Sequence, residues 1–340
     1  MRRLLRALAW VGLLGLLTGS AAGVLVWRDY QAFVQTPLRS LEPTLEVDLP
    51  KGASLLRSLR VLREAGIREG QDLYWRYLAY DMGVQARLKA GEYLLVANMT
   101  PRAVLQQLAD GKVIQRKFTI IEGWSFRELR AALAKLDAVR HTLSDASEAE
   151  IMRLLGREGV AAEGRFLPET YLYTRHTTDT DLLRRAMQAM DRQLADIWAA
   201  RDADLPLQSA EEALILASII EKETGQSGER AEIAGVFVRR LRIGMRLQTD
   251  PTVIYGIGRD FDGNLTRAHL LADTPWNTYT RAGLPPTAIA MPGRAALVAA
   301  VHPATGKALY FVARGDGSHV FSDSLNEHNR AVRRFQLGQP

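Results

Sequence analysis

The chain opens with a long apolar segment. Residues 7–27 form an uninterrupted run of 21 uncharged residues, rich in Leu, Val, Ala and Gly. A helix of this length reaches roughly 30 Å, the thickness of a bilayer core. Arg2, Arg3 and Arg6 precede it, and basic residues favour the cytoplasmic side of a membrane. The pattern predicts a cytoplasmic tail over 1–6, a transmembrane helix over 7–27 and export of everything that follows.

A cleaved signal peptide is the alternative for this segment. Gly19-Ser20-Ala21-Ala22 supplies small residues near a possible cleavage point. The apolar run continues through Trp27, however, which is longer than a typical signal-peptide core and favours a retained anchor. Both interpretations place the remainder of the chain outside the cytoplasm.

The next residues alternate between short strand and helix patterns. Residues 28–43 contain Pro37 and Pro43 and predict an extended linker. Over residues 44–115 the sequence predicts a small α/β region, which suits either a carbohydrate-binding module or a packing subdomain. Its expected elements are a strand at 45–49, a helix from Ser54 to before Gly66, a helix over 70–82, a strand at 91–96 and a helix opened by Thr100-Pro101.

Residues 116–340 predict a larger domain of mixed α+β class. A strand is expected at Phe118–Ile121, and Ser125 with Glu128 forms a capping box for the following helix. Beyond residue 150 helices and short strands are interspersed with Gly and Pro turns, without a repeat.

Charge and composition exclude several classes of function. The formal net charge is +6, but four arginines and no acid lie within the first 28 residues. The remainder carries 40 basic and 38 acidic residues with no long run of one sign, which argues against nucleic acid. Cysteine is absent, so disulfides and thiolate metal sites are excluded. The six histidines are scattered, and neither a metal site nor a cofactor is expected.

The most informative segment is the expected buried helix over 209–225. Ser209 and Glu212 match a capping box, and Gly225 occupies the position of a C-cap glycine. Glu221 and Glu223 stand at its C-terminal end, where the helix dipole disfavours carboxylates. Burial and the dipole both raise the pKa of a glutamate, as a general acid for a glycosidic oxygen requires. Glu221, which lies on the same stripe of the helix as Leu214, Ala217 and Ser218, is therefore a candidate general acid.

Two alternatives remain for these glutamates. One could pair with Lys222 or Arg230 while the other is solvated, a purely structural arrangement. Residues two apart on a helix point about 200° from each other, so the two carboxyl groups cannot flank one bond. A glycan-cleaving site here would therefore use a single carboxylate of this helix, with the substrate supplying its own nucleophile.

Several segments, taken in order, resemble one family across nearly the whole chain. They are the N-terminal anchor, residues 163–171 (EGRFLPETY), 216–224 (LASIIEKET), 247–256 (LQTDPTVIYG), 277–279 (NTY), 283–286 (GLPP), 317–321 (GSHVF) and Glu327-His328. The chain resembles the MltG (YceG-like) endolytic murein transglycosylases.

The resemblance implies a specific chemistry. It makes residues 44–115 a LysM-like subdomain and residues 116–340 the YceG-like catalytic domain. Glu221 would protonate the oxygen between MurNAc and GlcNAc, and a 1,6-anhydro ring would close on the cut end. Family members cleave nascent strands beside the inner membrane, alongside glycan-polymerising penicillin-binding proteins. The expected substrate-binding residues are Glu163, Gln248, Asp250, Asn277 and Tyr279.

Two rival functions stay open. A hydrolytic muramidase would leave reducing ends, and it needs a second carboxylate from elsewhere in the fold. A non-catalytic wall-binding scaffold would tolerate loss of Glu221.

Overall fold

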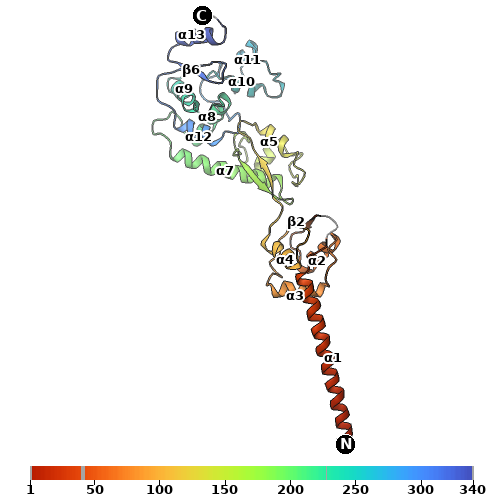
Figure 1. Ribbon diagram of the computed structural model, residues 1–340. Coiled ribbons are helices and arrows are strands. Elements are labelled where there is room, and N and C mark those ends of the chain that lie inside the picture. Colours follow the sequence, from red (N-terminus) through yellow and green to blue (C-terminus); the bar gives the residue numbers. More distant parts are fainter. Residues whose placement is uncertain (1, 40–42, 227, 339–340) are drawn as a thin grey trace. The chain divides into compact units, whose positions relative to one another are not determined.

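The computed structural model describes residues 2–39, 43–226 and 228–338, and it divides into two compact units (Figure 1). The small unit comprises Met1–Arg116 with Thr174–His176, and the large unit comprises Lys117–Tyr173 and Thr177–Pro340. The described residues leave out Met1 of the expected tail, residues 40–42 of the expected linker and the last two residues of the expected catalytic domain. Both units mix helices and strands, which confirms the α+β class.

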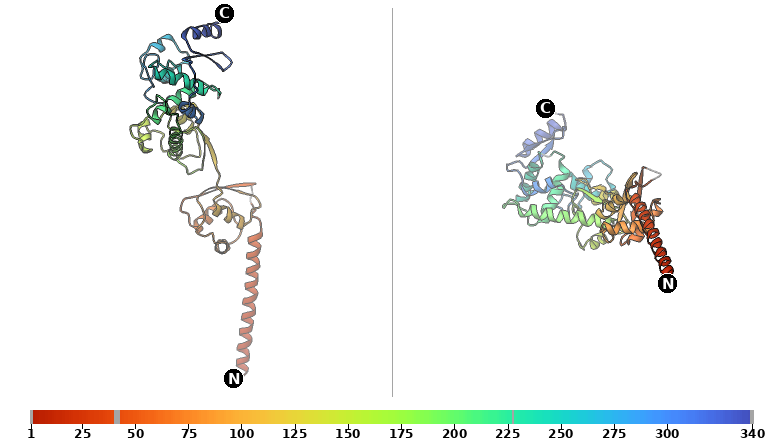
Figure 2. Two further views of the ribbon diagram at one scale, coloured as in Figure 1. Left: turned by 90° about the vertical axis from the view of Figure 1, so that its left-hand side faces the viewer. Right: turned by 60° about the horizontal axis from the view of Figure 1, so that its bottom comes forward.

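The small unit begins with the long helix α1 (Arg2–Gln35), which runs unbroken in all three views (Figures 1 and 2). Within the described residues, the segment Leu8–Gln35 is both long enough and apolar enough to span a membrane. The helix continues past the expected end at Trp27 into residues for which the sequence predicted a linker. Tyr30, Phe33 and Val34 are buried, so their packing stabilises these extra turns.

Two antiparallel strands and three helices enclose the core of the small unit. β1 (Thr44–Leu49) pairs with β2 (Gly91–Val96), so that Leu49 lies opposite Gly91. The helices are α2 (Leu55–Glu64), α3 (Asp72–Asp81) and α4 (Pro101–Asp110). Ser54 and Thr100 cap α2 and α4 as expected. Trp75, Leu78, Tyr93, Leu105 and Leu108 are among its fully buried side chains.

A buried carboxylate of this unit forms ion pairs with two segments that are far apart in the sequence. The side chain of Glu92 is 2% exposed and lies 2.5 Å from Nη1 of Arg116 and 2.6 Å from Nη2 of Arg175. Burial raises the pKa of Glu92, but the two guanidinium groups outweigh it and hold the pKa below its usual range. Because a buried carboxylate is tolerated only when paired, these contacts hold residues 174–176 against β2.

The large unit starts with a second small sheet. β3 (Arg116–Thr119) pairs with β4 (Thr170–Tyr173), so the first strand lies two residues before its expected position. The helices around it are α5 (Phe126–Leu133), α6 (Glu148–Leu154) and α7 (Asp179–Ala199). Ser125 and Glu128 form the expected capping box of α5.

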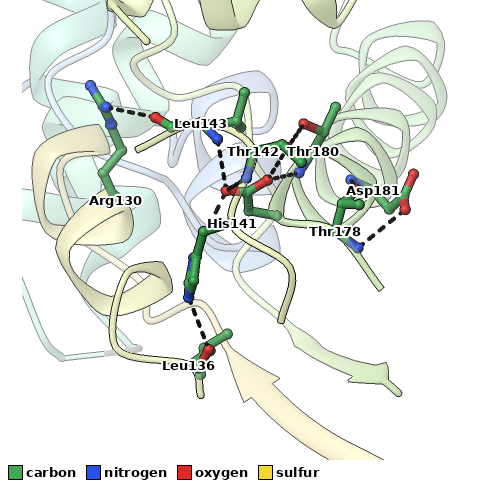
Figure 3. A network of polar contacts seen from close by, with 9 residues as sticks. Arg130, Leu136, His141, Thr142, Leu143, Thr178, Thr180 and Asp181 are labelled. Atoms are coloured by element: carbon green, nitrogen blue, oxygen red, sulfur yellow. Dashed lines mark hydrogen bonds and ion pairs between the residues drawn. The ribbon is translucent and has the colours of Figure 1, made fainter. Parts of the chain in front are cut away.

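Asp179, the first residue of α7, organises the loop after α5, in which Figure 3 labels Thr142 and Leu143. Its side chain is 4% exposed. Its Oδ2 accepts hydrogen bonds from the backbone N of Thr142 (2.9 Å) and Leu143 (3.0 Å), and its Oδ1 accepts one from the backbone N of Thr180. Arg130 of α5 donates to the carbonyl of Leu143 from the other side. An acid at a helix N-terminus is favourable, and here it also satisfies loop N–H groups.

The second half of the large unit is built around a buried three-helix core. α8 (Ala210–Glu223), α9 (Arg230–Arg242) and α12 (Arg294–Val301) pack against one another. The peripheral elements are α10 (Asp250–Ile257), η1 (Gly258–Asp260), α11 (Arg267–Leu271), β5 (Tyr310–Ala313), β6 (His319–Ser322) and α13 (Leu325–Phe335). β5 and β6 form an antiparallel hairpin, with the expected turn at residues 314–317.

Candidate active site

Helix α8 carries both glutamates to the surface of its unit. Residues 213–220 are all buried, as the apolar sequence predicts. The expected capping box forms only in half, because the Glu212 carboxylate accepts from the backbone N of Gln208 instead of that of Ser209. The helix ends at Thr224, whose backbone is extended, so Gly225 is not the left-handed C-cap that the sequence predicted.

Glu221 occupies a tight polar junction. Its side chain is 6% exposed, its Oε2 accepts from the backbone N of Gly293 (2.8 Å), and its Oε1 lies 3.5 Å from Nη2 of Arg230. Burial and the nearby Glu122 carboxylate raise the pKa of Glu221, while the Gly293 N–H and Arg230 oppose them. This ion pair with Arg230 is one of the two structural contacts, with Lys222 or with Arg230, that the sequence left open for these glutamates.

Glu122 is a neighbour of this junction that the sequence did not single out. A methyl group on Gly293 would lie 1.8 Å from Oε1 of Glu122, so the carboxylate fits only because residue 293 has no side chain. Lys222 donates to the carbonyl of Gly123 in the same loop (3.3 Å). These contacts join the loop before α5, the end of α8 and the start of α12.

Glu223 points to the other side of α8, as the helical geometry predicts, and lines a cavity of about 520 Å³. The hydroxyl of Thr249 donates to its Oε1. Burial raises the pKa of Glu223 to about 7, with the Asp250 carboxylate acting in the same direction. Thr249, His319 and Arg240 lower it. An exchangeable proton near neutral pH therefore sits at the wall of a polar cavity.

Three expected substrate-binding residues gather at this cavity. Gln248, Asp250 and Tyr279 line it together with Glu223. The sequence did not predict that these three residues surround Glu223. The Tyr279 hydroxyl donates to Oδ1 of Asp250 (2.6 Å). Gln248 has a positive φ of 50°, an uncommon conformation that turns the chain at the cavity edge.

Other lining residues come from segments whose roles the sequence left unassigned. His319 lies in residues 317–321, and His328 follows Glu327 on α13. Arg240 of α9 is 7% exposed and donates to backbone carbonyls, including that of Leu247 (2.6 Å). His319 and His328 lie in segments that carried the family resemblance, whereas Arg240 does not, and the distance along the sequence concealed that the three converge.

Glu163 lies in a different and larger cavity, of about 1010 Å³. Its oxygens accept from the backbone N of Phe126 (2.9 and 3.2 Å), which is the first residue of α5. Burial raises the pKa of Glu163 to about 7, while the Phe126 N–H and the Tyr255 hydroxyl lower it. Trp276 lines the same cavity and donates from its indole N–H to the Thr287 hydroxyl (2.9 Å).

Asn277, another expected substrate contact, lies in the interior of the large unit. The residue has no exposed surface. Its Nδ2 donates to the carbonyls of Leu270 (3.1 Å) and Ala272 (2.6 Å), and its Oδ1 accepts from the backbone N of Tyr279 (2.8 Å). An amide offers both donors and an acceptor, so it can satisfy the backbone of a buried loop and thereby position Tyr279.

Across the described ranges, no three His, Asp or Glu side chains lie close enough to hold a metal ion. Carboxyl, imidazole, guanidinium, amide and phenol groups line the two cavities.

Comparison with known proteins gives consistent matches. The model of the YceG-like family matches residues 47–334. An endolytic murein transglycosylase of Bacillus subtilis (strain 168) is 28% identical over 309 residues, which cover 86% of this chain and 85% of that protein. One from Streptococcus pneumoniae serotype 2 is 27% identical, covering 84% of this chain and 57% of the relative. A crystal structure of a putative YceG-like protein from Listeria monocytogenes has a TM-score of 0.52 and 28% identity, covering 85% of this chain and 98% of the other.

Proposed function

The chain belongs to the YceG-like family, and from that premise we propose that it is an endolytic murein transglycosylase, which cuts peptidoglycan glycan strands at internal bonds. One observation carries the proposal. Glu221 stands at the C-terminal end of the buried helix α8 with its side chain 6% exposed, and burial and the Glu122 carboxylate raise its pKa. A carboxyl group that holds its proton in this way suits protonation of a glycosidic oxygen.

We propose Glu221 as the acid/base, the residue that the family resemblance implies. Its Oε2 accepts from the backbone N of Gly293, and its Oε1 lies 3.5 Å from Nη2 of Arg230, so these two groups orient the carboxyl group. Glu223, which lines the cavity of about 520 Å³ on the other side of α8, is the alternative. Both glutamates stand on the same helix, so the choice between them is tested by paired substitutions.

The proposed reaction proceeds in two steps. Glu221 donates its proton to the oxygen between MurNAc and GlcNAc as the bond from C1 of MurNAc breaks, and the acetamido oxygen bonds to C1. The Glu221 carboxylate then takes the proton of the C6 hydroxyl. The C6 oxygen displaces the acetamido oxygen at C1 and closes the 1,6-anhydro ring. Glu221 is protonated again, and no water is consumed.

Hydrolysis with Glu223 as the acid is the second candidate, and Asp250 is the observation that favours it. Asp250 supplies a second carboxylate at the cavity of Glu223, which the helix alone could not provide. In an inverting hydrolase a second carboxylate activates water. The hydrogen bond from Tyr279 occupies one oxygen of Asp250 and supports a binding role instead.

The products distinguish these functions. We expect the full chain in detergent to convert membrane-derived, uncrosslinked glycan strands into fragments with 1,6-anhydro-MurNAc ends, read by mass spectrometry. Reducing MurNAc ends would establish the hydrolase. Absence of cleavage, with strands retained on the protein, would establish the wall-binding scaffold.

The pH dependence of cleavage is a further prediction. Burial raises the pKa of Glu221, and only its protonated form can act as the acid. The value of kcat/KM should therefore fall as the pH rises through this raised pKa. Glu122→Gln removes a carboxylate that raises this pKa, so the falling limb should move to lower pH. A falling limb at the same pH in Glu122→Gln and in the wild type would exclude Glu221 as the group that sets it.

The larger cavity is proposed to hold the strand beyond the cleaved bond. Tyr255 and Trp276 line it and offer aromatic surface against which sugar rings can pack, and Glu163 fixes the adjoining end of α5. A volume of about 1010 Å³ accommodates more than one sugar ring. Glu163 would thus shape the groove, because its carboxylate accepts from the backbone N of Phe126 and so determines where α5 begins.

The surroundings of the enzyme complete the proposal. The apolar part of α1 is a candidate anchor in the inner membrane, and the arginines at residues 2, 3 and 6 favour a cytoplasmic N-terminus. The large unit would then act in the periplasm on nascent strands and terminate their elongation. We propose that the small unit is a LysM-like glycan-binding unit and that glycan-polymerising penicillin-binding proteins are partners.

A further inference from the structure

Helix α3 of the small unit turns an apolar face outward. Leu73, Tyr77 and Tyr80 are 64%, 47% and 69% exposed. At about 100° per residue these three positions lie within about 60° of one another around the helix. Trp75 and Leu78 point the opposite way and are buried in the core of the unit. The core therefore does not need the three outward side chains, which together are named the α3 face.

The α3 face begins where the uncharged run of α1 ends. Trp27 is the last residue of that run, and its ring lies 5.7 Å from the ring of Tyr30. The Tyr30 ring in turn lies 5.1 Å from the ring of Tyr77, measured between centroids. Trp27 itself is 54% exposed. A chain of three aromatic rings thus leads from the end of the apolar run to the α3 face.

Ring contacts also show which side of α3 is nearer to the apolar run. Trp75 packs against Phe33, with centroids 5.4 Å apart, whereas Tyr77 packs against Tyr30, about one helical turn nearer to Trp27. Figure 1 shows α3 at the end of the small unit from which α1 projects, with β2 at the opposite end. The α3 face therefore lies on the side of the small unit toward which the apolar part of α1 extends.

Helical geometry gives the depth of this face in a membrane. When residues 7–27 fill the hydrocarbon core of a bilayer, Trp27 stands at its outer boundary. Tyr30 follows about 5 Å further along the helix axis, within a headgroup layer of roughly 5–8 Å. Tyr77 contacts Tyr30 and so reaches the same layer. Tyrosine and tryptophan favour this layer because their rings are apolar and their polar ends reach water.

The charges around the α3 face do not form a basic patch. Arg63 pairs with Asp72 at the first residue of α3 (3.0 Å). Arg102 pairs with Asp81 at its last residue (3.2 Å). Arg76 stands between these two acids in the same helix. Attraction to anionic headgroups needs an excess of basic residues, so a contact with lipid here depends on aromatic and aliphatic surface.

We propose that the α3 face docks on the outer surface of the phospholipid bilayer that α1 spans, with Leu73, Tyr77 and Tyr80 at the level of the headgroups. The inference rests on the membrane anchor of the proposed function. A single spanning helix leaves the unit that follows it free to tilt, whereas a second contact beside the helix restricts that motion. α1 and the α3 face together hold the small unit in one orientation against the membrane.

Fluorescent labels on single cysteines measure this contact, since the chain contains no cysteine. Full-length Leu73→Cys and Val96→Cys are labelled with bimane and reconstituted in phosphatidylcholine vesicles that contain a headgroup-spin-labelled lipid. Val96 is 50% exposed on β2 and provides the matched control. We expect the label at residue 73 to be quenched at least about threefold more strongly than the label at residue 96. Equal quenching at the two positions would overturn the inference.

A label within the apolar run separates docking from the anchor. Leu17→Cys, labelled in the same way, should be quenched by lipids that carry the spin label on the acyl chain. Quenching at residue 17 without quenching at residue 73 would overturn docking and leave the proposed anchor standing. Absence of quenching at both residues would overturn the anchor and docking together. Glycan cleavage by the unlabelled protein is measured separately and depends on neither result.

A substitution within the α3 face tests whether its apolar surface makes the contact. Tyr80→Glu places a carboxylate at an exposed position and should leave Tm within about 2 °C of the wild type. Quenching of the label at residue 73 should then fall to about the level found at residue 96. Leu94→Glu, at an exposed position of β2, should leave that quenching unchanged. Undiminished quenching in Tyr80→Glu would count against the α3 face as the docking surface.

Lipid charge and added glycan test the competing ligands. Quenching at residue 73 should be the same in phosphatidylcholine vesicles and in vesicles that also contain phosphatidylglycerol, because the α3 face is not basic. Quenching confined to the phosphatidylglycerol vesicles would overturn docking through apolar surface. A label at residue 73 that lipid leaves unquenched, but whose emission shifts when a GlcNAc–MurNAc oligosaccharide is added, would show that the face binds sugar and would likewise overturn the inference.

Discussion

Glu221→Gln is expected to lower the rate of glycan cleavage by about 1000-fold, whereas Glu223→Gln should retain activity within about tenfold of the wild type. Glutamine has nearly the same shape as glutamate, and its amide oxygen can still accept from the Gly293 N–H. The substitution therefore removes the transferable proton with little change in packing. Because Glu221 is the proposed acid, its loss should abolish protonation of the leaving oxygen.

Glu223→Gln is a demanding control because it lies two residues away on the same helix. It removes a buried carboxyl group while preserving an acceptor for the Thr249 hydroxyl. We expect little change in kcat, since Glu223 points to the other side of α8. Initial rates of strand cleavage and thermal melts of both variants make the comparison. Full activity in Glu221→Gln, with loss in Glu223→Gln, would move the acid/base to Glu223.

Asn277→Ala is expected to lower the free energy of unfolding of the large unit by about 3 kcal/mol. The substitution removes one buried amide that serves the carbonyls of Leu270 and Ala272 and the backbone N of Tyr279. Each group would lose its partner where water cannot replace it. The loop that carries Tyr279 should loosen, and catalysis should suffer through misplacement of that side chain.

Thermal unfolding of the full chain in detergent measures this effect. For a unit of this size about 3 kcal/mol corresponds to a fall in Tm of roughly 6–12 °C. Asn264, an exposed asparagine in the loop before α11, provides the control, and Asn264→Ala should leave Tm nearly unchanged. An Asn277→Ala protein with wild-type Tm but weakened glycan binding would instead identify Asn277 as a direct substrate contact.

Local signals in the sequence were sufficient for much of the secondary structure. Ser54, Thr100 and Ser125 begin helices as expected, because a cap depends on residues within one turn of it. The burial of residues 213–220 could be predicted because this helix is apolar on all sides. The errors arose where distant packing decides. α1 extends through Tyr30 and Phe33 because they find partners in the small unit, which no local pattern records.

The candidate site shows the same division. The sequence by itself determined that two carboxyl groups stand at the end of a buried helix and point to opposite sides, because helical periodicity fixes this from spacing alone. Only the tertiary structure decided what each one contacts, since Gly293 and Arg230 contact Glu221, whereas segments from five other elements line the cavity of Glu223. It also placed Asn277 in the interior and His319 beside Glu223. Convergence of residues far apart in the chain depends on packing between elements, and spacing along one helix or strand holds no information about that packing.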